Sequence, residues 1–466
     1  MKKIFKTKET INKKIHKVYL LLALIIGVTL SIAMPFFNEP DGQYHYTAST
    51  NIARLSNDLS AYGEVAIGSG IDQQLERYQR GNYFEAYYKN KIKKMPIKSL
   101  PRLNYVPKKT NYDYWGHIIP AIGVKLGYMI YPSLGVMIVV ARLLMTFLCS
   151  IAMFLIIKWV KAGKLLFVVV SLSPVITNTF ASLSYDATNY VLASFTVACA
   201  INIVVRRNIL FRDFIYLLLS SIALLFGSKT NTMLLISLIP LVILVTFLRS
   251  KREERKEPVI GKRRARNNDH SWYSWKKLWI ILSLLISVLV LVIIFKPTVV
   301  FNLYRVVINY LINVNPGLTP GSIFQSTLAS PYPGVNYIPL WVSSLWYILI
   351  VLVLFAEEKY VWSKWLSLFA GVLFVLGIVA VFYKYTNFVT VGPKVSSNQK
   401  IGGIVGVQGR YFTPSLLLLS LWAGYDKFNL KIKSYKFVTI LSIIVIVIVI
   451  SNALLLFGTL FPIYYL

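Results

Sequence analysis

Long apolar runs with few or no charged side chains alternate with shorter polar segments along the chain. The first run extends from Val18 to Phe37 without a charge, which is enough for one membrane-spanning helix of about 20 residues. It is too long for the core of a signal peptide, and no good small-residue cleavage site follows it, so we expect an uncleaved first helix. Ten further runs lie at 134–157, 165–182, 187–205, 213–227, 231–248, 278–296, 338–356, 363–383, 411–425 and 436–458. The pattern predicts an all-α polytopic membrane protein with about eleven transmembrane helices.

Lysine and arginine concentrate in every second segment between these runs. If the N-terminus is cytoplasmic, the cytoplasmic loops are 158–164, 206–212, 249–277, 357–364 and 426–436. All but 357–364, which is short and balanced, are clearly basic, as the positive-inside rule requires. Residues 1–17 hold seven lysines and one acid, and residues 249–277 hold eleven Lys or Arg and four acids. We therefore expect a multi-pass protein of the cell membrane, with a basic cytoplasmic tail over 1–17 and one multispan domain over 18–466.

Composition agrees with a membrane protein and excludes a soluble one. Hydrophobic residues make up 56% of the 466 and charged residues 15%, with a mean hydropathy of +0.60, whereas soluble domains carry roughly a quarter charged residues. A net charge of +32 would point to nucleic acid in a soluble protein. Here the charge flanks apolar runs, so we expect contact with anionic lipids and no nucleic-acid partner. Cys149 and Cys199 both lie inside apolar runs and are expected to be packing residues.

Three long segments face outward in this topology, 38–133, 297–337 and 384–410. The first is the largest exoplasmic loop, mostly polar, rich in tyrosine and with eight acids. Its last part, from Trp115 to Tyr131, is apolar but interrupted by proline and glycine, and we expect a helix that lies at the membrane surface. A span there would move every later loop to the other side and would break the charge pattern.

Ionisable residues gather where the apolar runs meet the outside. They come from four parts of the sequence: Glu39, Asp41 and His45 after the first run, Asp186 between the third and fourth, Lys229 between the fifth and sixth, and Arg410 before the tenth. Charged groups at membrane depth are costly and are a functional-site hypothesis by default. The common depth therefore predicts one site at the outer face.

The segment that leaves the first run contains three of these groups. Pro40 and Gly42 break the helix and turn the chain. Glu39, Asp41 and His45 would then lie close together at the membrane surface, which favours a raised carboxylate pKa and a general base. Two carboxylates and an imidazole are also ligands for a divalent metal such as Mg²⁺ or Mn²⁺. The alternative is a polar segment that only solvates the end of the helix.

The other groups also have structural alternatives. Asp186 either adds a carboxylate to the site or caps the helix that follows. Lys229 follows Gly-Ser, as in a phosphate-binding loop. The upstream glycine and the strand of that motif are missing, so we reject nucleotide binding. Lys229 could still neutralise a phosphate. Arg410 suits a phosphate at a helix start, or else an interfacial anchor in an aromatic belt. The aromatic segment 111–117 either anchors at the headgroup level or stacks on a sugar.

The order and spacing of these pieces resemble a known family. The pieces are Pro40-Asp41 with His45, Ser184-Tyr185-Asp186-Ala187, Lys229, and Gln408-Gly409-Arg410-Tyr411-Phe412, of which the last is the most specific. From about residue 30 to about residue 425 the chain resembles the bacterial predicted membrane proteins of domain-of-unknown-function family 2142. That family is similar to the GT-C fold glycosyltransferases, so the resemblance implies a GT-C-like architecture.

The resemblance also implies an activity: transfer of a sugar from a polyprenyl-phosphate donor to a cell-envelope glycan or lipid acceptor at the exoplasmic face. Asp41 matches the acid that serves as base or metal partner in the first outer loop, with Glu39 and His45 beside it. The implied substrate-binding residues are Asp186, Lys229, Gln408, Arg410 and Tyr411. The family pattern often has a second acid directly after the aspartate, whereas Gly42 stands there in this chain. A metal held by Asp41 and Glu39 therefore stays an open alternative.

Two other classes of membrane protein would also use basic groups at the outer face. A transporter or flippase of lipid-linked glycans would need polar residues through the full membrane depth, whereas the apolar runs are nearly free of them, and no internal repeat supports an inverted-repeat transporter. A polysaccharide polymerase would have its large outer loop late in the chain, whereas here the largest is 38–133. The glycosyltransferase hypothesis therefore ranks first.

Overall fold

The computed structural model describes residues 2–55, 84–92, 108–254, 297–313, 323–333, 335–336, 338–386, 404, 406–427 and 434–461. Within these ranges the regular secondary structure is helical, apart from isolated β-bridges such as the one between Val361 and Tyr425. The helices up to residue 206 are α1 (Lys2–Ala33), α2 (Gly42–Ile52), η2 (Glu85–Lys89), α4 (Tyr112–Gly116), α5 (Ile118–Ile130), α6 (Leu134–Trp159), α7 (Lys164–Ser171), α8 (Pro174–Phe180) and α9 (Asp186–Arg206). Those that follow are α10 (Phe211–Gly227), α11 (Thr230–Met233), η4 (Leu234–Ser237), α12 (Leu238–Glu254), α14 (Pro297–Asn313), α15 (Ile323–Ser326), α16 (Leu340–Ala356), α17 (Lys364–Tyr385), η5 (Gly409–Tyr411), η6 (Thr413–Leu417), α18 (Leu418–Ala423) and α19 (Ser434–Leu460).

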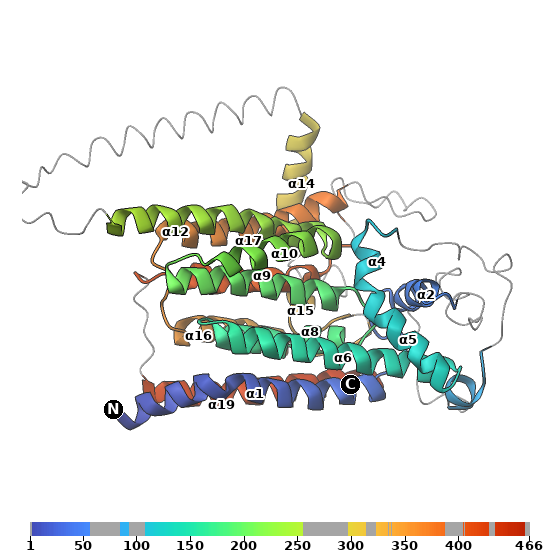
Figure 1. Ribbon diagram of the computed structural model, residues 1–466. Coiled ribbons are helices and arrows are strands. Elements are labelled where there is room, and N and C mark those ends of the chain that lie inside the picture. Colours follow the sequence, from blue (N-terminus) through green and yellow to red (C-terminus); the bar gives the residue numbers. More distant parts are fainter. Residues whose placement is uncertain are drawn as a thin grey trace, which may run out of the picture.

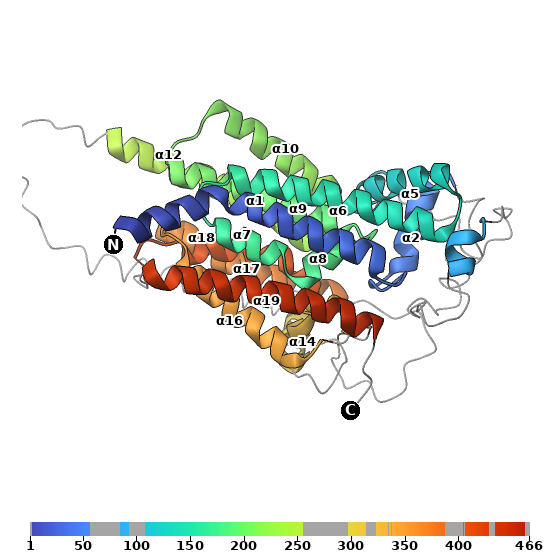
Figure 2. The ribbon, with the colours of Figure 1, turned by 90° about the horizontal axis from the view of Figure 1, so that it is seen from below.

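The long helices run side by side in one bundle (Figure 1). The short helices α2, α4 and α5 gather at one end of it, which we call the α2 end, and the N-terminus lies at the opposite end. The view from below shows the same division, with α1, α6 and α19 spanning the length of the bundle (Figure 2). Residues 34–41, which connect α1 to α2, therefore lie at the α2 end.

At the opposite end, which we call the Glu357 end, lie loops that the charge pattern assigned to the same side of the membrane. Glu357 accepts a hydrogen bond from the backbone N–H of Leu165 at 2.5 Å, so it satisfies an unpaired donor in the first turn of α7. Trp362 donates its indole N–H to the carbonyl of Val204 at 3.0 Å, and Lys359 donates to the carbonyl of Ala423 at 2.8 Å. The loops after α6, α9, α16 and α18 thus share one end, as predicted, and Glu357, one of the two acids of 357–364, has a structural role there.

Helix α9 is the central helix of the bundle. Of the most apolar 18-residue stretch of α9, 72% is buried inside the protein, compared with 33–50% for the corresponding stretches of the other candidate spans. Small residues such as Ala193, Ser194 and Ala198 let neighbouring helices approach it closely, as is usual for helix packing in membranes. Because α9 begins at Asp186, this residue lies at the centre of the α2 end.

Six helices in the described ranges are long and apolar enough to cross a membrane. They are Lys14–Ala33, Leu134–Trp159, Asp186–Arg206, Asn231–Arg249, Lys364–Tyr385 and Val438–Leu460. A polytopic helical membrane protein is therefore confirmed, but the structure does not support the predicted count of eleven. The predicted span 278–296 lies outside the described residues. Helices α10 and α16 have 17 residues each, and at 1.5 Å per residue they are shorter than a hydrocarbon core of about 30 Å.

Two further predicted spans are not continuous helices. The run 165–182 is divided into α7 and α8, because Pro174 has no N–H with which to continue the ladder of α7. Asn452 of α19 stabilises this break by donating to the carbonyl of Leu172 at 3.0 Å and by accepting from the hydroxyl of Thr177 at 2.6 Å. The run 411–425 forms η5, η6 and the six-residue α18. Apolar content alone did not reveal these interruptions.

The predicted helix within 115–131 is present as α5 and packs against α6. A Cβ atom at Gly123 would lie 2.5 Å from Ala141 Cα, and one at Gly127 would lie 2.6 Å from Met137 Cα. The two glycines are four residues apart, the spacing that lets two helix backbones meet closely in membranes. With 13 residues, α5 is too short to cross a core of about 30 Å, in agreement with the prediction that it is not a span.

Candidate functional site

The turn between α1 and α2 places Asp41 at the α2 end in a constrained conformation. Phe37 and Asp41 have positive φ angles of 58° and 60°, which non-glycine residues seldom adopt and which cluster at functional sites. Gly42 makes the turn possible, because a Cβ atom there would lie 2.9 Å from Phe37 Cα and 3.2 Å from Glu39 Cδ. An acid at position 42 would not fit this turn unless the backbone moved.

Glu39 pairs with an arginine from the interior of the predicted span 134–157. Arg142 of α6 is fully buried, and its Nη2 lies 3.3 Å from Glu39 Oε2. The same guanidinium donates to the carbonyls of Met34 and Pro35, directly after the end of α1, at 2.8 and 3.0 Å. The expectation that the spans are nearly free of polar groups is wrong at this position. The geometry makes Glu39 a structural partner that holds the turn.

His45 of α2 forms a hydrogen bond with His117, which lies between α4 and α5. The distance from His45 Nδ1 to His117 Nε2 is 2.8 Å, and His117 Nδ1 lies 2.5 Å from the carbonyl oxygen of Asp113. Burial lowers the pKa of His117 to about 4. Burial, and then the nearby His117, Arg410 and Lys229, hold the pKa of His45 well below its usual value. Both imidazoles are therefore neutral at neutral pH.

Gln408 to Tyr411 form a tight turn that packs against α15. The N–H of Tyr411 donates to the carbonyl of Gln408 at 3.1 Å, and the N–H of Gly409 donates to Ser326 Oγ at 2.7 Å. A Cβ atom at Gly409 would lie 2.3 Å from the carbonyl oxygen of Ile323, so only glycine permits this approach. The turn therefore has a fixed position, from which the Arg410 side chain reaches the α2 end.

Side chains from α9 and α11 fasten the Lys229 segment to this turn. Asn189 of α9 accepts a hydrogen bond from the backbone N–H of Lys229 at 3.1 Å. Asn231 of α11 donates to the carbonyl of Tyr411 at 2.8 Å. Three segments far apart in the sequence are thus held together by bonds to the backbone, which set their positions more firmly than contacts between long side chains would.

A chain of ion pairs connects four of the predicted site residues. Arg410 Nη2 lies 3.5 Å from Asp41 Oδ2, Arg410 Nε lies 3.5 Å from Asp186 Oδ2, and Asp186 Oδ1 lies 2.6 Å from Lys229 Nζ. Asp186 is the first residue of α9, whose cap position is taken by Tyr185 without a side-chain capping bond. The alternative that Asp186 caps the helix is therefore wrong. Its carboxylate instead aligns two cations, and the Asp41 side chain, 48% exposed, lies at the open side of the network.

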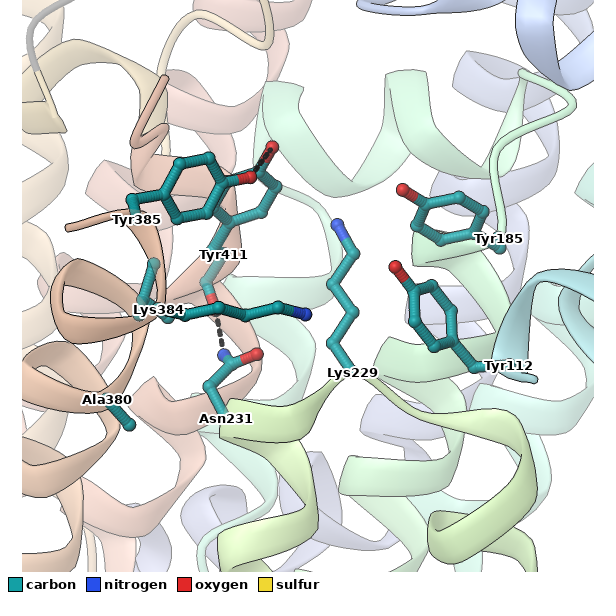
Figure 3. Close-up of a pocket in the computed structure, with 9 residues that line it drawn as sticks. Tyr112, Tyr185, Lys229, Asn231, Ala380, Lys384, Tyr385 and Tyr411 are labelled. Atoms are coloured by element: carbon teal, nitrogen blue, oxygen red, sulfur yellow. Dashed lines mark hydrogen bonds between the residues drawn. The ribbon is translucent and has the colours of Figure 1, made fainter. Parts of the chain in front are cut away.

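Next to this network lies a pocket lined by tyrosine and lysine side chains (Figure 3). Its lining consists of Tyr112, Tyr185, Lys229, Asn231, Ala380, Val381, Lys384, Tyr385 and Tyr411, and it encloses about 410 Å³ of empty space, part of it open to solvent. Lys229 Nζ lies 4.0 Å from the ring centre of Tyr411 and 4.7 Å from that of Tyr185. The hydroxyl groups of Tyr385 and Tyr411 are 3.3 Å apart. The charged groups of this lining are both cationic, Lys229 and Lys384.

Burial and nearby charge keep the hydroxyl groups of Tyr112 and Tyr185 in their hydrogen-donating form. Burial, and then the charge of Asp186, raise the pKa of Tyr185 well above its usual value. Burial, and then Asp113, likewise raise the pKa of Tyr112. Burial alone would lower the pKa of Arg410, but Asp186, Tyr411 and Asp41 outweigh this effect and raise the pKa above its usual value, so this guanidinium stays charged. The pocket therefore presents ammonium groups and O–H donors, which suits an anion.

The three residues predicted as metal ligands are not arranged to hold a metal ion together. Asp41 contacts Arg410, Glu39 contacts Arg142, and His45 contacts His117, so the three candidate ligands are directed to different partners. Among the residues that the structure describes, no group of three His, Cys, Asp or Glu side chains is placed to hold a metal ion. We derive no step of the chemistry through a metal.

Comparison with known proteins identifies the family. The model of a family described as predicted membrane protein (DUF2142) matches residues 24–307, more than half of the chain. The chain belongs to this family. No curated protein and no solved structure matches it. The DUF2142 match includes Asp41, Asp186 and Lys229 and ends before Arg410.

In this DUF2142 protein, most of the site residues expected from the sequence meet at the α2 end. Asp41, Asp186, Lys229, Arg410 and Tyr411 are in contact with one another through the network and the pocket, and His45 lies beside them. Gln408 closes the turn before Arg410 through its backbone carbonyl. Glu39 belongs to the separate contact with Arg142.

Several residues at the site were not predicted as site residues. Lys384 and Tyr385 directly follow the predicted span 363–383, and the depth argument that selected Lys229 applies to Lys384 as well. Tyr112 and His117 belong to the aromatic segment 111–117, for which the sequence left anchoring and sugar stacking open. Arg142 was also recognisable as the one charged residue inside the run 134–157, but its partner was not visible in the sequence.

Proposed function

We propose that this protein is a membrane glycosyltransferase that moves a sugar from a polyprenyl-phosphate donor to a cell-envelope glycan or lipid acceptor. The observation that carries the proposal is the pocket in which Lys229, Lys384 and four tyrosine hydroxyl groups converge. A phosphate group needs cations and hydrogen-bond donors. A lipid-linked donor has its phosphate at the headgroup level and its tail in the bilayer, so a site where helix ends meet the membrane surface suits it.

Asp41 is the proposed base. Its carboxylate is about half exposed, next to the pocket network, and so is accessible to an acceptor from the aqueous side. The acceptor hydroxyl gives its proton to Asp41, and its oxygen attacks the anomeric carbon of the donor sugar. The bond from this carbon to the phosphate oxygen breaks, and the leaving phosphate keeps the electron pair. Lys229 and Lys384 stabilise the added negative charge, and in-line displacement inverts the configuration at the sugar.

Removing a cation should mainly weaken donor binding. We expect Arg410→Ala and Lys229→Ala each to reduce the affinity for a polyprenyl-phosphate sugar by roughly 10- to 100-fold, because each loses a charge-assisted contact of about 1.5–3 kcal/mol. Arg410→Lys should also be impaired, since a point charge does not replace a planar fork. The measurement is binding of the lipid to purified protein in nanodiscs.

Lys125→Ala is the matched control, because Lys125 is an exposed lysine on α5. It should bind the lipid like the wild type, and thermal unfolding should show that all variants are folded. Unchanged affinity in Arg410→Ala would remove the phosphate role from this residue. A wild-type protein that binds the lipid but transfers no sugar would move the transporter hypothesis ahead.

The orientation of the protein is part of the proposal: the N-terminus is cytoplasmic and the α2 end is exoplasmic. The support is the basic charge at the Glu357 end. We expect a cysteine at Thr110, an exposed position at the α2 end, to react with an impermeant thiol reagent in intact cells. A cysteine at Lys161, exposed at the Glu357 end, should react only after the cells are opened. Cys149 and Cys199 are buried and should add little background. The reverse labelling would contradict the topology.

A further inference from the structure

The hydrogen bonds of the two buried histidines determine which ring nitrogens carry protons. A backbone carbonyl only accepts, so His117 Nδ1 donates to the oxygen of Asp113. A neutral His117 then has an unprotonated Nε2, which accepts the hydrogen bond from His45 Nδ1. His45 therefore carries its proton on Nδ1 and presents a lone pair at Nε2. This order of donors makes the Asp113 carbonyl the element that sets the tautomer of both rings.

The lone pair of His45 is buried without a protein partner. The imidazole is fully buried, and within the part of the chain that the structure describes its Nε2 forms no hydrogen bond. A buried acceptor without a donor costs roughly 1–3 kcal/mol, and such groups in native structures usually have a functional reason. The His45 ring forms a hydrogen bond to His117 through Nδ1 and an edge-to-face contact with Tyr185, with 4.8 Å between the ring centres.

The position of His45 connects this lone pair to the pocket. Tyr185 lines the pocket and contacts the His45 ring, and Lys229 Nζ lies 4.7 Å from the centre of the same Tyr185 ring. Asp41 is the residue before α2, and the His45 N–H donates to its carbonyl at 3.0 Å, so the two residues lie one helical turn apart. The His45 ring thus contacts a residue that lines the proposed phosphate site, and its backbone is bonded to that of the proposed base.

We propose that His45 Nε2 accepts a hydrogen bond from a hydroxyl group of the sugar attached to the donor phosphate, with His117 holding the required tautomer. This assignment rests on the proposed function and adds the recognition of the sugar to it. The ligand group must be an uncharged donor such as a hydroxyl or an amide N–H, because Nε2 has no proton to give. The proton of the acceptor still goes to Asp41, since two neighbouring cations oppose a positive charge on His45.

The tautomers are tested by nitrogen NMR of the full-length protein with ¹⁵N-labelled histidine in nanodiscs. The chain has four histidines, so the spectrum is simple, and His45→Gln and His117→Gln assign the two signals of interest. The expected result is a proton on Nδ1 and none on Nε2 in both rings at neutral pH. A proton on Nε2 of His45 would overturn the proposal, because the nitrogen could then no longer accept.

The recognition role is tested by comparing two lipids, polyprenyl phosphate and a polyprenyl-phosphate sugar, on two matched variants. In His45→Gln the amide oxygen reaches the place of Nε2, whereas in His45→Asn it ends near the place of Nδ1. We expect His45→Asn to weaken binding of the sugar-bearing lipid by about tenfold and to leave polyprenyl phosphate unchanged, since one buried hydrogen bond is lost. His45→Gln should retain most of the affinity for both lipids. His16→Gln, a buried histidine of α1, is the control.

The outcomes separate this assignment from the proposed function. Equal loss of both lipids in His45→Asn would indicate a purely structural role and would overturn the assignment, and so would unchanged binding of both. In either case wild-type binding of the two lipids leaves the proposed function standing. A wild-type protein that binds neither lipid would overturn the proposed function and the assignment with it.

Discussion

Sugar transfer by the Asp41→Asn variant is expected to be lower than that of the wild type by about 100-fold or more. Asparagine keeps the size of the side chain but does not take up the proton of the acceptor hydroxyl. The carboxylate also faces Arg410 across 3.5 Å, a contact that an amide makes only weakly, so some loss of order at the turn is expected as well. The measurement is transfer from a polyprenyl-phosphate sugar in membranes, normalised to the amount of protein.

Two further variants distinguish the base from its surroundings. Asp426→Asn changes an exposed acid at the Glu357 end and should leave transfer unchanged. Glu39→Gln should lower transfer less than Asp41→Asn, because Glu39 contacts Arg142 and not the pocket network. If Glu39→Gln abolished transfer at normal protein levels and Asp41→Asn spared it, Glu39 would be the base. If neither variant lowered sugar transfer, the turn would have no catalytic role.

Replacing Arg142 with methionine is expected to lower the free energy of unfolding by about 3–5 kcal/mol. The variant leaves the carboxylate of Glu39, 4% exposed, without its cation, and it also removes two hydrogen bonds to the end of α1. Methionine is close to arginine in volume, so a cavity is not the main cause of the expected loss of stability. The measurement is unfolding of the purified protein in detergent, followed by temperature or by added SDS.

The double variant Arg142→Met/Glu39→Gln is the control that separates the ion pair from the hydrogen bonds to α1. Removing both charges leaves no unpaired ion in the interior, so the double variant should be more stable than Arg142→Met alone. Arg212→Met, which changes an exposed arginine of α10, should be close to the wild type. A double variant no more stable than Arg142→Met would show that the hydrogen bonds to α1, and not the ion pair, carry the stabilisation.

The sequence was sufficient to predict the helical membrane class and the common depth of Asp41, Asp186, Lys229 and Arg410. Both predictions depend on properties that are local in the chain. A run of apolar residues must be helical in a membrane, because no water is present to satisfy its backbone groups. The charge of a loop determines its side, so residues at the ends of alternate spans lie at one face. In the structure these four side chains, separated by up to 369 residues, are connected by ion pairs.

The partner of each charge depended instead on how the helices pack. Glu39 and Asp41 are two residues apart, yet one pairs with Arg142 of α6 and the other with Arg410 of η5, because the turn at Gly42 directs them to different neighbours. The break between α7 and α8 is likewise stabilised by Asn452, 280 residues after Leu172. Depth in the membrane follows from the local sequence, but rotation and contact between helices follow from close packing of the whole bundle. For that reason the sequence predicted that Asp41, Asp186, Lys229 and Arg410 meet at one end, whereas only the packed helices show which of them pair.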